Sequence, residues 1–558
     1  MDERVKIFAL GGLDEDGKEC IVVDINNDLF VINCGVRFPD RTMPGIDYVI
    51  PNFDFLKENK DRVKAYFLLH GHDDETGALA YIYRDGPAPI YCSEVTKRMF
   101  LLFAHHAKID TNGFDFHIQK ATSDFVVAGR ACHFFHTAHN IADSSGLAIH
   151  TSLGNVVFTG DYVVENNATA GFLHDMNAIS KIAEEPTLAL MTESLYSDRL
   201  GYTAPNYKLS PLIESAIKDA EGRIFVSLFS MNLYNLSEMI SLAVSTHKKI
   251  LCYDEEGESI LRALQDCGQL LIPRNNYASI DEVLRLRDQD IMILMTGFGG
   301  KLYEKISDLA TNSHEDKRIR LKETDTFIVA SPANANTEIE ATDAVDELFR
   351  SGCKVINISK KVFYNMHASE EDLKMMISLF KPKYYIPVKG FYKDLLKNGL
   401  LALSMGIGLT HQNVFVMENG TSVIMDSKGA RLFNENIPHG DLMIDGIGVG
   451  DVANNVIDDR KKLSEGVVVL ALTVSKKKRE IVAGPDVQMR GFVFVKEADA
   501  VLKEVSRLFV TTVEDFLNAR MEYNLDEIKQ NVYEKCLRAI RRQTGREPMV
   551  LPLIVEVE

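Results

Sequence analysis

His70-Gly71-His72-Asp73-Asp74-Glu75 follows the apolar residues 65–69 and has the composition of a loop at the end of a buried strand. Its two imidazoles lie two positions apart, and carboxylates stand two and three residues after the second of them. Such a turn can converge four nitrogen or oxygen ligands on a small volume, which is how proteins hold Zn²⁺ or Mn²⁺. A bare H-x-H pattern fits a merely polar turn equally well, so the rest of the chain has to decide.

Other histidine and aspartate residues stand where later strands are expected to end. His139 follows the strand-like residues 133–138, and Asp161 follows the apolar residues 156–160. Residues 5–34 predict short strands joined by hairpin turns, and residues 75–84 predict a helix after the metal-like loop. Because loops at strand ends present side chains on a shared face, the pattern predicts an α/β segment in which these side chains meet.

The middle of the chain has a different pattern, in which strands and helices alternate regularly. Strands are expected near residues 223–227, 249–253, 290–295 and 326–330, with helices at 237–246 and 340–350. This alternation is typical of an α/β domain with a parallel sheet. Strand patterns that end at polar residues return at 354–358 and 384–388, so the simplest account is a domain inserted into the first one.

Taken in chain order, these motifs resemble a known family. The series His70, His72, Asp74, His139 and Asp161 is similar to the metal-binding series of the metallo-β-lactamase fold. The inserted domain, followed by His367 and by Pro387-Val388-Lys389-Gly390, resembles the β-CASP nucleases of that superfamily. The glycine-rich residues 445–452, Ala483-Gly484-Pro485 and residues 489–493 then resemble ribonuclease J. The resemblance covers essentially the whole chain.

The resemblance implies both a fold and a domain order. The fold is α/β: an αββα sandwich of the metallo-β-lactamase type, with an inserted β-CASP domain containing a parallel sheet and a small C-terminal α/β domain. Residues 1–205 and 351–435 would form the two parts of the sandwich and residues 206–350 the insertion. Residues 436–455 would be a linker, and residues 456–558 a domain that serves self-association.

The resemblance also implies a site with two metal ions bridged by Asp161. The four ligands of the first ion, which are all present, are His70, His72, His139 and Asp161. The second ion would need Asp74, Asp161 and two further histidines, but Glu75 and Lys389 stand at those two positions. We therefore expect one Zn²⁺ or Mn²⁺ per chain rather than two.

The physical chemistry of lysine explains why Lys389 matters most. An ammonium group has three donors and no lone pair, so it cannot coordinate a metal ion and is repelled by a dication. Glu75 alone would only retune the site, because a carboxylate can still bind Mn²⁺ or Zn²⁺. Our hypothesis is that Lys389 takes the place of the second ion and pairs with Glu75 and Asp74.

Further roles follow from the same resemblance. Asp74 and His367 match catalytic positions, and Glu193 is an acceptable match for an aspartate at its strand end. Asn33 stands where the family usually has an aspartate. The substrate-contacting run, which begins with histidine in the family, is here Phe363, Tyr364, Asn365, Met366 and His367.

Composition limits the classes of function. The chain has 558 residues and a net charge of −18, which argues against unselective coating of nucleic acid but leaves a local basic channel possible. The eight cysteines include no C-x-x-C pair, which fits reduced thiols in the cytoplasm. The charged start predicts no signal peptide, and no apolar run is long enough for a membrane span.

Three functions remain open at this stage. The first is a catalytically weakened ribonuclease J-like protein that binds RNA and partners an active paralogue in a mixed oligomer. The second is an active single-metal enzyme that degrades RNA from its 5′ end and also cuts internally. The third is a non-catalytic scaffold of an RNA-degradation complex, and in each case a homodimer or higher homo-oligomer is an expected assembly. The processes implied are ribosomal RNA processing and messenger RNA decay.

Overall fold

The computed structural model describes residues 3–39, 42–165, 171–334, 337–434, 437–446, 448–449, 454–491, 498–519 and 523–558. These residues form two compact units, the first comprising residues 1–38 and 48–442 and the second residues 39–47 and 443–558. Parts of the expected linker, of the glycine-rich segment 445–452 and of the motif at 489–493 lie outside the described residues. The domain boundaries given above stay predictions.

The first unit contains an eight-stranded sheet in the order β20-β19-β1-β2-β3-β5-β6-β7. Its strands are β1 (Val5–Gly11), β2 (Cys20–Ile25), β3 (Asp28–Ile32), β5 (Val63–Phe67), β6 (Ile90–Cys92), β7 (Phe116–Ile118), β19 (Ser422–Asp426) and β20 (Gly429–Phe433). The hairpin between β2 and β3 turns at Asn26 and Asn27, which both have positive φ angles, as residues of tight hairpin turns do. The strands predicted within residues 5–34 are confirmed.

A six-stranded sheet, ordered β18-β12-β11-β10-β9-β8, packs face to face with the first. Its strands are β8 (Ser123–Val127), β9 (Arg130–His136), β10 (Ser145–Ile149), β11 (Asn155–Phe158), β12 (Thr187–Thr192) and β18 (Tyr384–Pro387). The shared core includes Ile7, Val23, Phe67, Phe134 and Leu147. Because β12 and β18 pair in parallel, strands from both sides of the inserted segment lie side by side.

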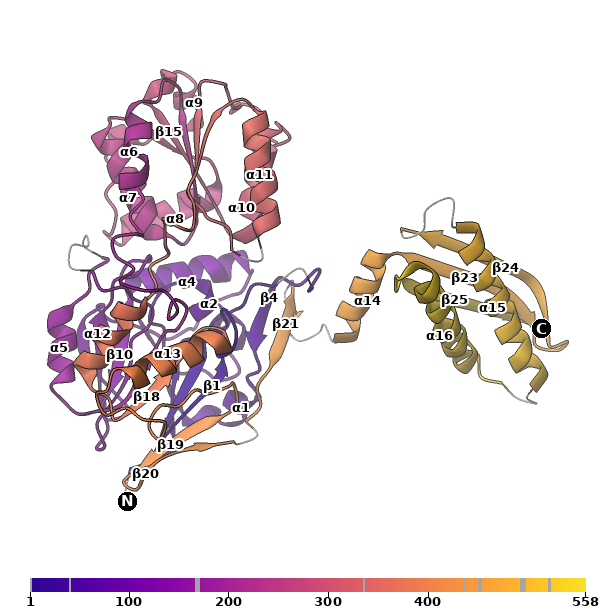
Figure 1. The fold of residues 1–558 in the computed structure, drawn as a ribbon, viewed down its shortest axis with the longest axis horizontal. Helices are drawn as coiled ribbons and strands as arrows, with labels where there is room; N and C mark the ends of the chain where they lie inside the picture. Colours follow the sequence, from indigo (N-terminus) through magenta and orange to yellow (C-terminus); the bar gives the residue numbers. More distant parts are fainter. Residues whose placement is uncertain are drawn as a thin grey trace. The chain divides into compact units, whose positions relative to one another are not determined.

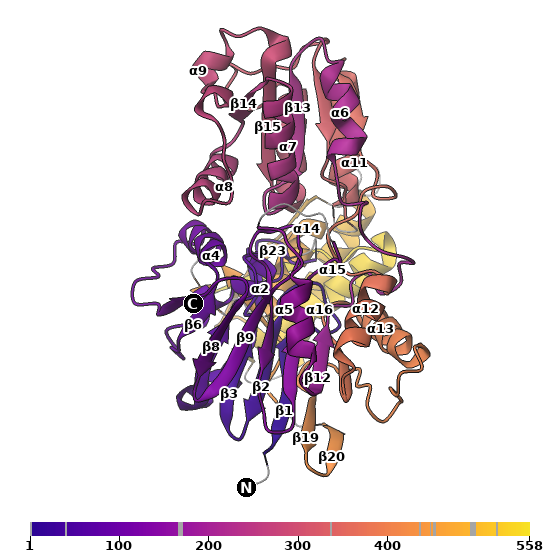
Figure 2. The same cartoon turned by 90° about the vertical axis from the view of Figure 1, so that its left-hand side faces the viewer.

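Helices cover the outer faces of the two sheets, which gives four αββα layers (Figure 1), and α5 lies in front of the strands in Figure 2. The helices are α1 (Asp54–Glu58), α2 (Asp73–Thr76), α3 (Leu79–Ile82), α4 (Glu94–His106), α5 (Met176–Ala183), α12 (Glu370–Phe380) and α13 (Tyr392–Ser404); β4 (Tyr48–Pro51) precedes α1. The single helix predicted at 75–84 was wrong. The Cys34 N–H donates to the Glu75 carbonyl and the Leu79 N–H donates to the Cys34 carbonyl, so a neighbouring loop takes the bond that a continuous helix would make.

The inserted segment forms a parallel sheet in the order β14-β15-β13-β16-β17 (Figure 1). Its strands are β13 (Ile224–Phe229), β14 (Lys249–Cys252), β15 (Ile291–Gly297), β16 (Thr326–Val329) and β17 (Lys354–Asn357). One face is covered by α6 (Ser210–Lys218), α7 (Leu233–Ser245) and α8 (Glu255–Asp266), and the other by α10 (Gly299–Ala310) and α11 (Glu338–Arg350). The short helices of this segment are α9 (Ile280–Val283), η2 (Arg274–Asn276) and η3 (Asp288–Asp290), whereas η1 (Lys60–Arg62) precedes β5 in the sandwich.

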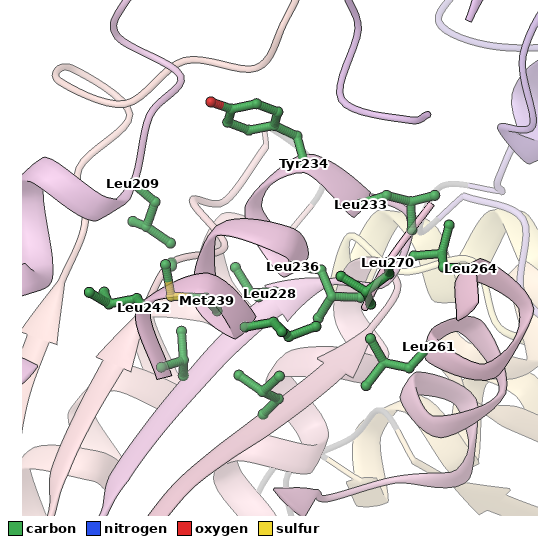
Figure 3. Packing of buried hydrophobic residues seen from close by; sticks show 14 of the residues in the cluster. Leu209, Leu228, Leu233, Tyr234, Leu236, Met239, Leu242, Leu261, Leu264 and Leu270 are labelled. Carbon is green, nitrogen blue, oxygen red and sulfur yellow. The ribbon is translucent and has the colours of Figure 1, made fainter. Parts of the chain in front are cut away.

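A large apolar cluster fixes the inserted sheet above the sandwich. Leu233, Leu236 and Met239 of α7 belong to this cluster with Leu228 of β13, and Leu236 and Met239 lie beside Leu228 (Figure 3). The same cluster includes Met99 of α4, so the packing continues into the sandwich. This continuity holds the loop that follows β13 close to the His70 loop.

The second unit contains a sheet in the order β24-β23-β25. Its elements are α14 (Asn454–Glu465), β23 (Val467–Ser475), β24 (Glu480–Arg490), α15 (Ala498–Ala519), α16 (Leu525–Thr544) and β25 (Met549–Val557), with the short strands β21 (Asp441–Asp445) and β22 (Gly448–Val449) before them. Helices α15 and α16 cover one face of this sheet, and the apolar side chains Ile528, Val532, Cys536 and Ile540 of α16 are buried there. The predicted fold class is therefore confirmed. Among the described residues, none of the helices combines the length and apolar character that a membrane crossing needs.

Candidate metal centre

Three strand ends of the sandwich bring the predicted ligands together. His70 and His72 follow β5, His139 follows β9, and Asp161 follows β11. Gly160, with φ of +63°, makes the turn before Asp161, and a Cβ atom there would lie 2.9 Å from the Ser145 carbonyl oxygen. Only glycine fits this turn without strain, so the sequence Thr-Gly-Asp positions the carboxylate.

The facing atoms of these four side chains are spaced like the ligands of one metal ion. His72 Nδ1 lies 3.1 Å from His70 Nε2 and 3.4 Å from His139 Nε2. Asp161 Oδ2 lies 3.5 Å from His139 Nε2 and 3.8 Å from His70 Nε2. Ligand atoms around a tetrahedral ion at 2.0–2.2 Å are roughly 3.3–3.6 Å apart, so a Zn²⁺ or Mn²⁺ ion fits this set.

The protonation of the histidines also suits metal binding. Burial, together with the neighbouring imidazoles, holds the pKa of His70 and of His139 well below the usual range, and burial lowers that of His72. His139 Nδ1 lies 2.6 Å from the carbonyl oxygen of Met366, and His72 Nε2 lies 3.3 Å from that of Met231. When these nitrogens donate to the carbonyls, the opposite nitrogens keep their lone pairs toward the cluster.

Lys389 reaches the same cluster from the end of β18. Its Nζ lies 2.6 Å from Asp161 Oδ2, 2.5 Å from Glu75 Oε1 and 3.6 Å from Asp74 Oδ2. Although burial alone would lower it, the pKa of Lys389 is held well above the usual range by these carboxylates, Asp161 first. The ammonium is thus charged and enclosed, with 3% of its side chain exposed. The backbone of Lys389 has φ of +56°, a strained conformation of the kind that concentrates at functional sites.

Asn33 connects this ammonium to a second carboxylate. Its Nδ2 donates to Glu75 Oε2 at 2.5 Å and to Glu19 Oε2 at 3.0 Å, while its Oδ1 accepts from the Leu69 N–H. Burial raises the pKa of Glu19 to about 7. Asn33, Glu75 and Lys389 therefore form one chain of hydrogen bonds that ends at Asp161. Glu19 was not among the predicted residues, because no local pattern marks it.

His367 and Glu193 form a pair on the other side of Asp161. Glu193 Oε2 accepts from His367 Nδ1 at 2.7 Å, and its Oε1 accepts from the N–H groups of Tyr162 and Ala368. Burial opposes charge on His367, but Glu193 and then Asp161, whose Oδ2 is 3.6 Å away, raise its pKa above the usual value. Glu193 and Asp161 therefore favour the protonated form of His367 beside the metal ligands, and ligand atoms of Asp161, Glu193 and His367 form a second group that could hold a metal ion.

Comparison with known proteins gives the family. Residues 221–348 match the model of the ribonuclease J β-CASP domain, and residues 455–557 match that of the ribonuclease J C-terminal domain. Ribonuclease J 2 of Staphylococcus epidermidis is 32% identical over 558 residues, covering all of this chain and 99% of the relative. Ribonuclease J 2 of Staphylococcus aureus is 32% identical over 560 residues with the same coverage.

This chain belongs to the ribonuclease J family. Its fold is that of the metallo-β-lactamase superfamily with a β-CASP insertion. A crystal structure of a protein of unknown function from Enterococcus faecalis shares this fold, with a TM-score of 0.51 and 14% identity over 75% of this chain and all of that one. These matches confirm the resemblance to ribonuclease J that was stated from the sequence.

The run at 363–367 divides into core and surface in this ribonuclease J-family protein. The side chains of Phe363 and Met366 are 2% and 1% exposed and belong to the apolar cluster under the insertion. Met366 still contributes its carbonyl to His139. Tyr364, Asn365 and His367 are partly exposed, so they are the members of this run whose side chains RNA could reach.

A small cavity of about 50 Å³ lies on the far side of the His70 loop. Asp73 lines it together with Phe38, Tyr48, Phe298 and Glu256 from the sandwich and the insertion. Burial, with smaller contributions from Asp74 and Glu256, raises the pKa of Asp73 to about 8. The folded protein therefore keeps a proton on Asp73 that the unfolded chain releases near pH 3.8.

The substitution Asp73→Asn is expected to make the protein less sensitive to pH. Stability from protonated Asp73 is complete below pH 3.8 and is lost as pH rises toward 8, whereas asparagine stays neutral. The variant should gain about 5 kcal/mol in unfolding free energy relative to wild type between pH 4 and pH 8. Urea unfolding in EDTA measures this, and Glu256→Gln should give a smaller gain. Parallel pH curves for wild type and Asp73→Asn would contradict the protonation of Asp73.

Proposed function

We propose that this ribonuclease J-family protein binds RNA, holds one divalent ion through His70, His72, His139 and Asp161, and hydrolyses RNA weakly. We further propose that it acts in RNA processing and decay in the cytoplasm, as a partner of an active paralogue. The proposal of reduced activity is supported by the position of Lys389 Nζ, which lies within 2.6 Å of carboxylate oxygens of both Asp161 and Glu75. The domain boundaries predicted from the sequence belong to the same proposal.

Lys389 supports a single-ion site for two reasons. Its ammonium pairs with the carboxylates that a second ion would use, and it repels any dication that approaches them. Glu75, which could otherwise be a ligand, is held by Asn33 as well as by Lys389. One fixed positive charge therefore balances carboxylates that would otherwise attract a second ion.

The remaining side chains supply parts of a phosphodiester hydrolase. A bound Zn²⁺ or Mn²⁺ ion would supply Lewis-acid activation of a phosphodiester. Glu193 favours the protonated form of His367, which can donate its Nε2 proton to a phosphate oxygen. Asp74, which is partly exposed beside Lys389, is the carboxylate placed to accept a proton from water. The intact ligand set and His367 favour, as a second candidate, an active single-metal ribonuclease.

Association is proposed from the second unit. Leu551, Leu553 and Val555 of β25 are each at least 42% exposed on the sheet face that α15 and α16 leave open. A row of exposed apolar side chains is a frequent mark of a protein interface. This face could join two copies of this chain or this chain and an active paralogue. A protein that associates through it but binds no RNA would be a scaffold.

Metal content tests the proposal directly. Protein dialysed against Zn²⁺ or Mn²⁺ is expected to retain one ion per chain by elemental analysis, and His72→Ala should retain almost none. Wild type should bind 5′-monophosphorylated single-stranded RNA at low salt and hydrolyse it slowly, and His72→Ala should abolish hydrolysis. Two tightly held ions per chain would contradict the single-ion site. A mixture with the active paralogue, measured by light scattering, tests the mixed oligomer.

A further inference from the structure

Arg199 lies between the rings of two tyrosines, one of which neighbours His367. Its guanidinium carbon is 3.8 Å from the ring centroid of Tyr196 and 3.7 Å from that of Tyr364. Tyr196 and Arg199 come from the loop after β12, whereas Tyr364 comes from the loop between β17 and α12. Both faces of the guanidinium plane are thus covered by aromatic rings, an arrangement that stabilises the cation and fixes its orientation.

This cation has no acidic partner among the residues that the structure describes. Arg37, Arg62 and Arg223, which are also largely buried, each pair with an aspartate. Arg199 makes no such ion pair within the described ranges, and its Nη1 is buried there without a hydrogen-bond acceptor. In a chain with a net charge of −18, a largely enclosed guanidinium that no carboxylate neutralises is suited to an anionic ligand.

The stack is held next to His367. The ring centroids of Tyr196 and His367 are 5.5 Å apart, and His367 Nδ1 is 3.6 Å from the metal-cluster atom Asp161 Oδ2. Backbone hydrogen bonds tie the two loops together, from the Glu370 N–H to the Arg199 carbonyl and from the Tyr364 N–H to the Asn206 carbonyl. The guanidinium is therefore separated from the His367 side chain by one aromatic ring, that of Tyr196.

The stacking leaves only the edge of the guanidinium for a ligand, and because Nη1 on that edge is buried, a ligand would meet Nε and Nη2. Donors on that edge lie in one plane and match two oxygens of a phosphate group, and the rings that hold the plane reduce the entropy lost on binding. We propose that Arg199, stacked between Tyr196 and Tyr364, binds an RNA phosphate adjacent to the one at His367. This inference rests on the proposed function, since it names a second contact for the same RNA.

The test uses the full-length protein and a short single-stranded RNA in 5′-phosphate and 5′-hydroxyl forms. Arg199→Gln is expected to weaken binding about tenfold and to reduce the slope of log K against log salt by about 0.7, the value for one phosphate contact on a single strand. Arg199→Lys should recover part of the affinity, and Tyr364→Leu should weaken binding while the charge is kept. Arg350→Gln, at an exposed arginine of α11, is the matched control and should bind like wild type.

Metal content separates this inference from the proposed function, because Arg199→Gln should keep the same number of ions per chain as wild type. Equal losses on both RNA forms assign the contact to an internal phosphodiester, and a loss confined to the 5′-phosphate form assigns it to the terminal phosphate. Unchanged affinity and salt slope in Arg199→Gln and Tyr364→Leu would overturn the inference while leaving the proposed function in place. Failure of wild type to bind either RNA would overturn both.

Discussion

Changing Glu75 and Lys389 together to histidine is expected to raise the metal content from one ion to two per chain and RNA hydrolysis by roughly 10²–10³-fold. The double substitution removes the ammonium that pairs with Asp161 and Asp74, and it places neutral nitrogen donors where the second ion would bind. A second ion contributes several kcal/mol of charge stabilisation in the transition state, which corresponds to this change in rate. Elemental analysis and initial rates on 5′-monophosphorylated RNA are the two measurements.

The single substitutions serve as controls for this gain. Glu75→His alone keeps the ammonium, which still excludes a second dication, so one ion and wild-type activity are expected. Adding Asn33→Asp to the double variant should increase metal affinity further, because a carboxylate can accept from the imidazole next to it and orient it. If the double variant folds, as judged by its circular dichroism, and still binds one ion, the ammonium is not what excludes the second ion.

The sequence predicted the fold, and it predicted that the candidate ligands would lie together, because strand patterns and short-range motifs are local. Strand ends carried His70, His139 and Asp161, and the fold brought them to one cluster. The helix predicted at 75–84 was wrong because hydrogen bonds to Cys34, forty residues away, override local helix propensity. The residues near position 75 give no signal of these hydrogen bonds, because the partner residue is distant in the sequence.

Contacts across the chain were likewise invisible in the sequence. The contacts of Asn33 with Glu19 and Glu75 were not predicted. The stacking of Arg199 on Tyr364 was not predicted either, because the two residues are 165 positions apart and belong to no common sequence motif. Phe363 and Met366 resemble members of a substrate-contacting run, yet the apolar cluster beneath the insertion buries their side chains. Tertiary packing decides which side chains of a loop are exposed to solvent, so the sequence of the loop itself does not predict their exposure.

Lys389→Met is expected to lower the free energy of unfolding by about 3–5 kcal/mol, because it leaves buried carboxylates without their counter-charge. The pairing holds the pKa of Asp161 well below 3.8 even though burial raises it, so this contribution is present above pH 3.8 and is lost as pH falls further. Urea unfolding in EDTA at pH 7 measures the loss. Combining Lys389→Met with Glu75→Gln should recover part of it, since one of the unpaired charges is removed while the hydrogen bond from Asn33 is kept.

The increase in stability on adding divalent ions distinguishes two roles of Lys389: replacement of a second metal ion, or an ordinary salt bridge. Mn²⁺ or Zn²⁺ should stabilise Lys389→Met more than wild type, because the carboxylates of Asp74, Glu75 and Asp161 become available to a second ion. Lys18 is the matched control, since it is equally buried and pairs with Glu15 and Asp441 away from the cluster. Lys18→Met should lose stability without gaining a stronger response to metal. An equal metal response in both variants would show that the charge of Lys389 is structural and does not stand in for an ion.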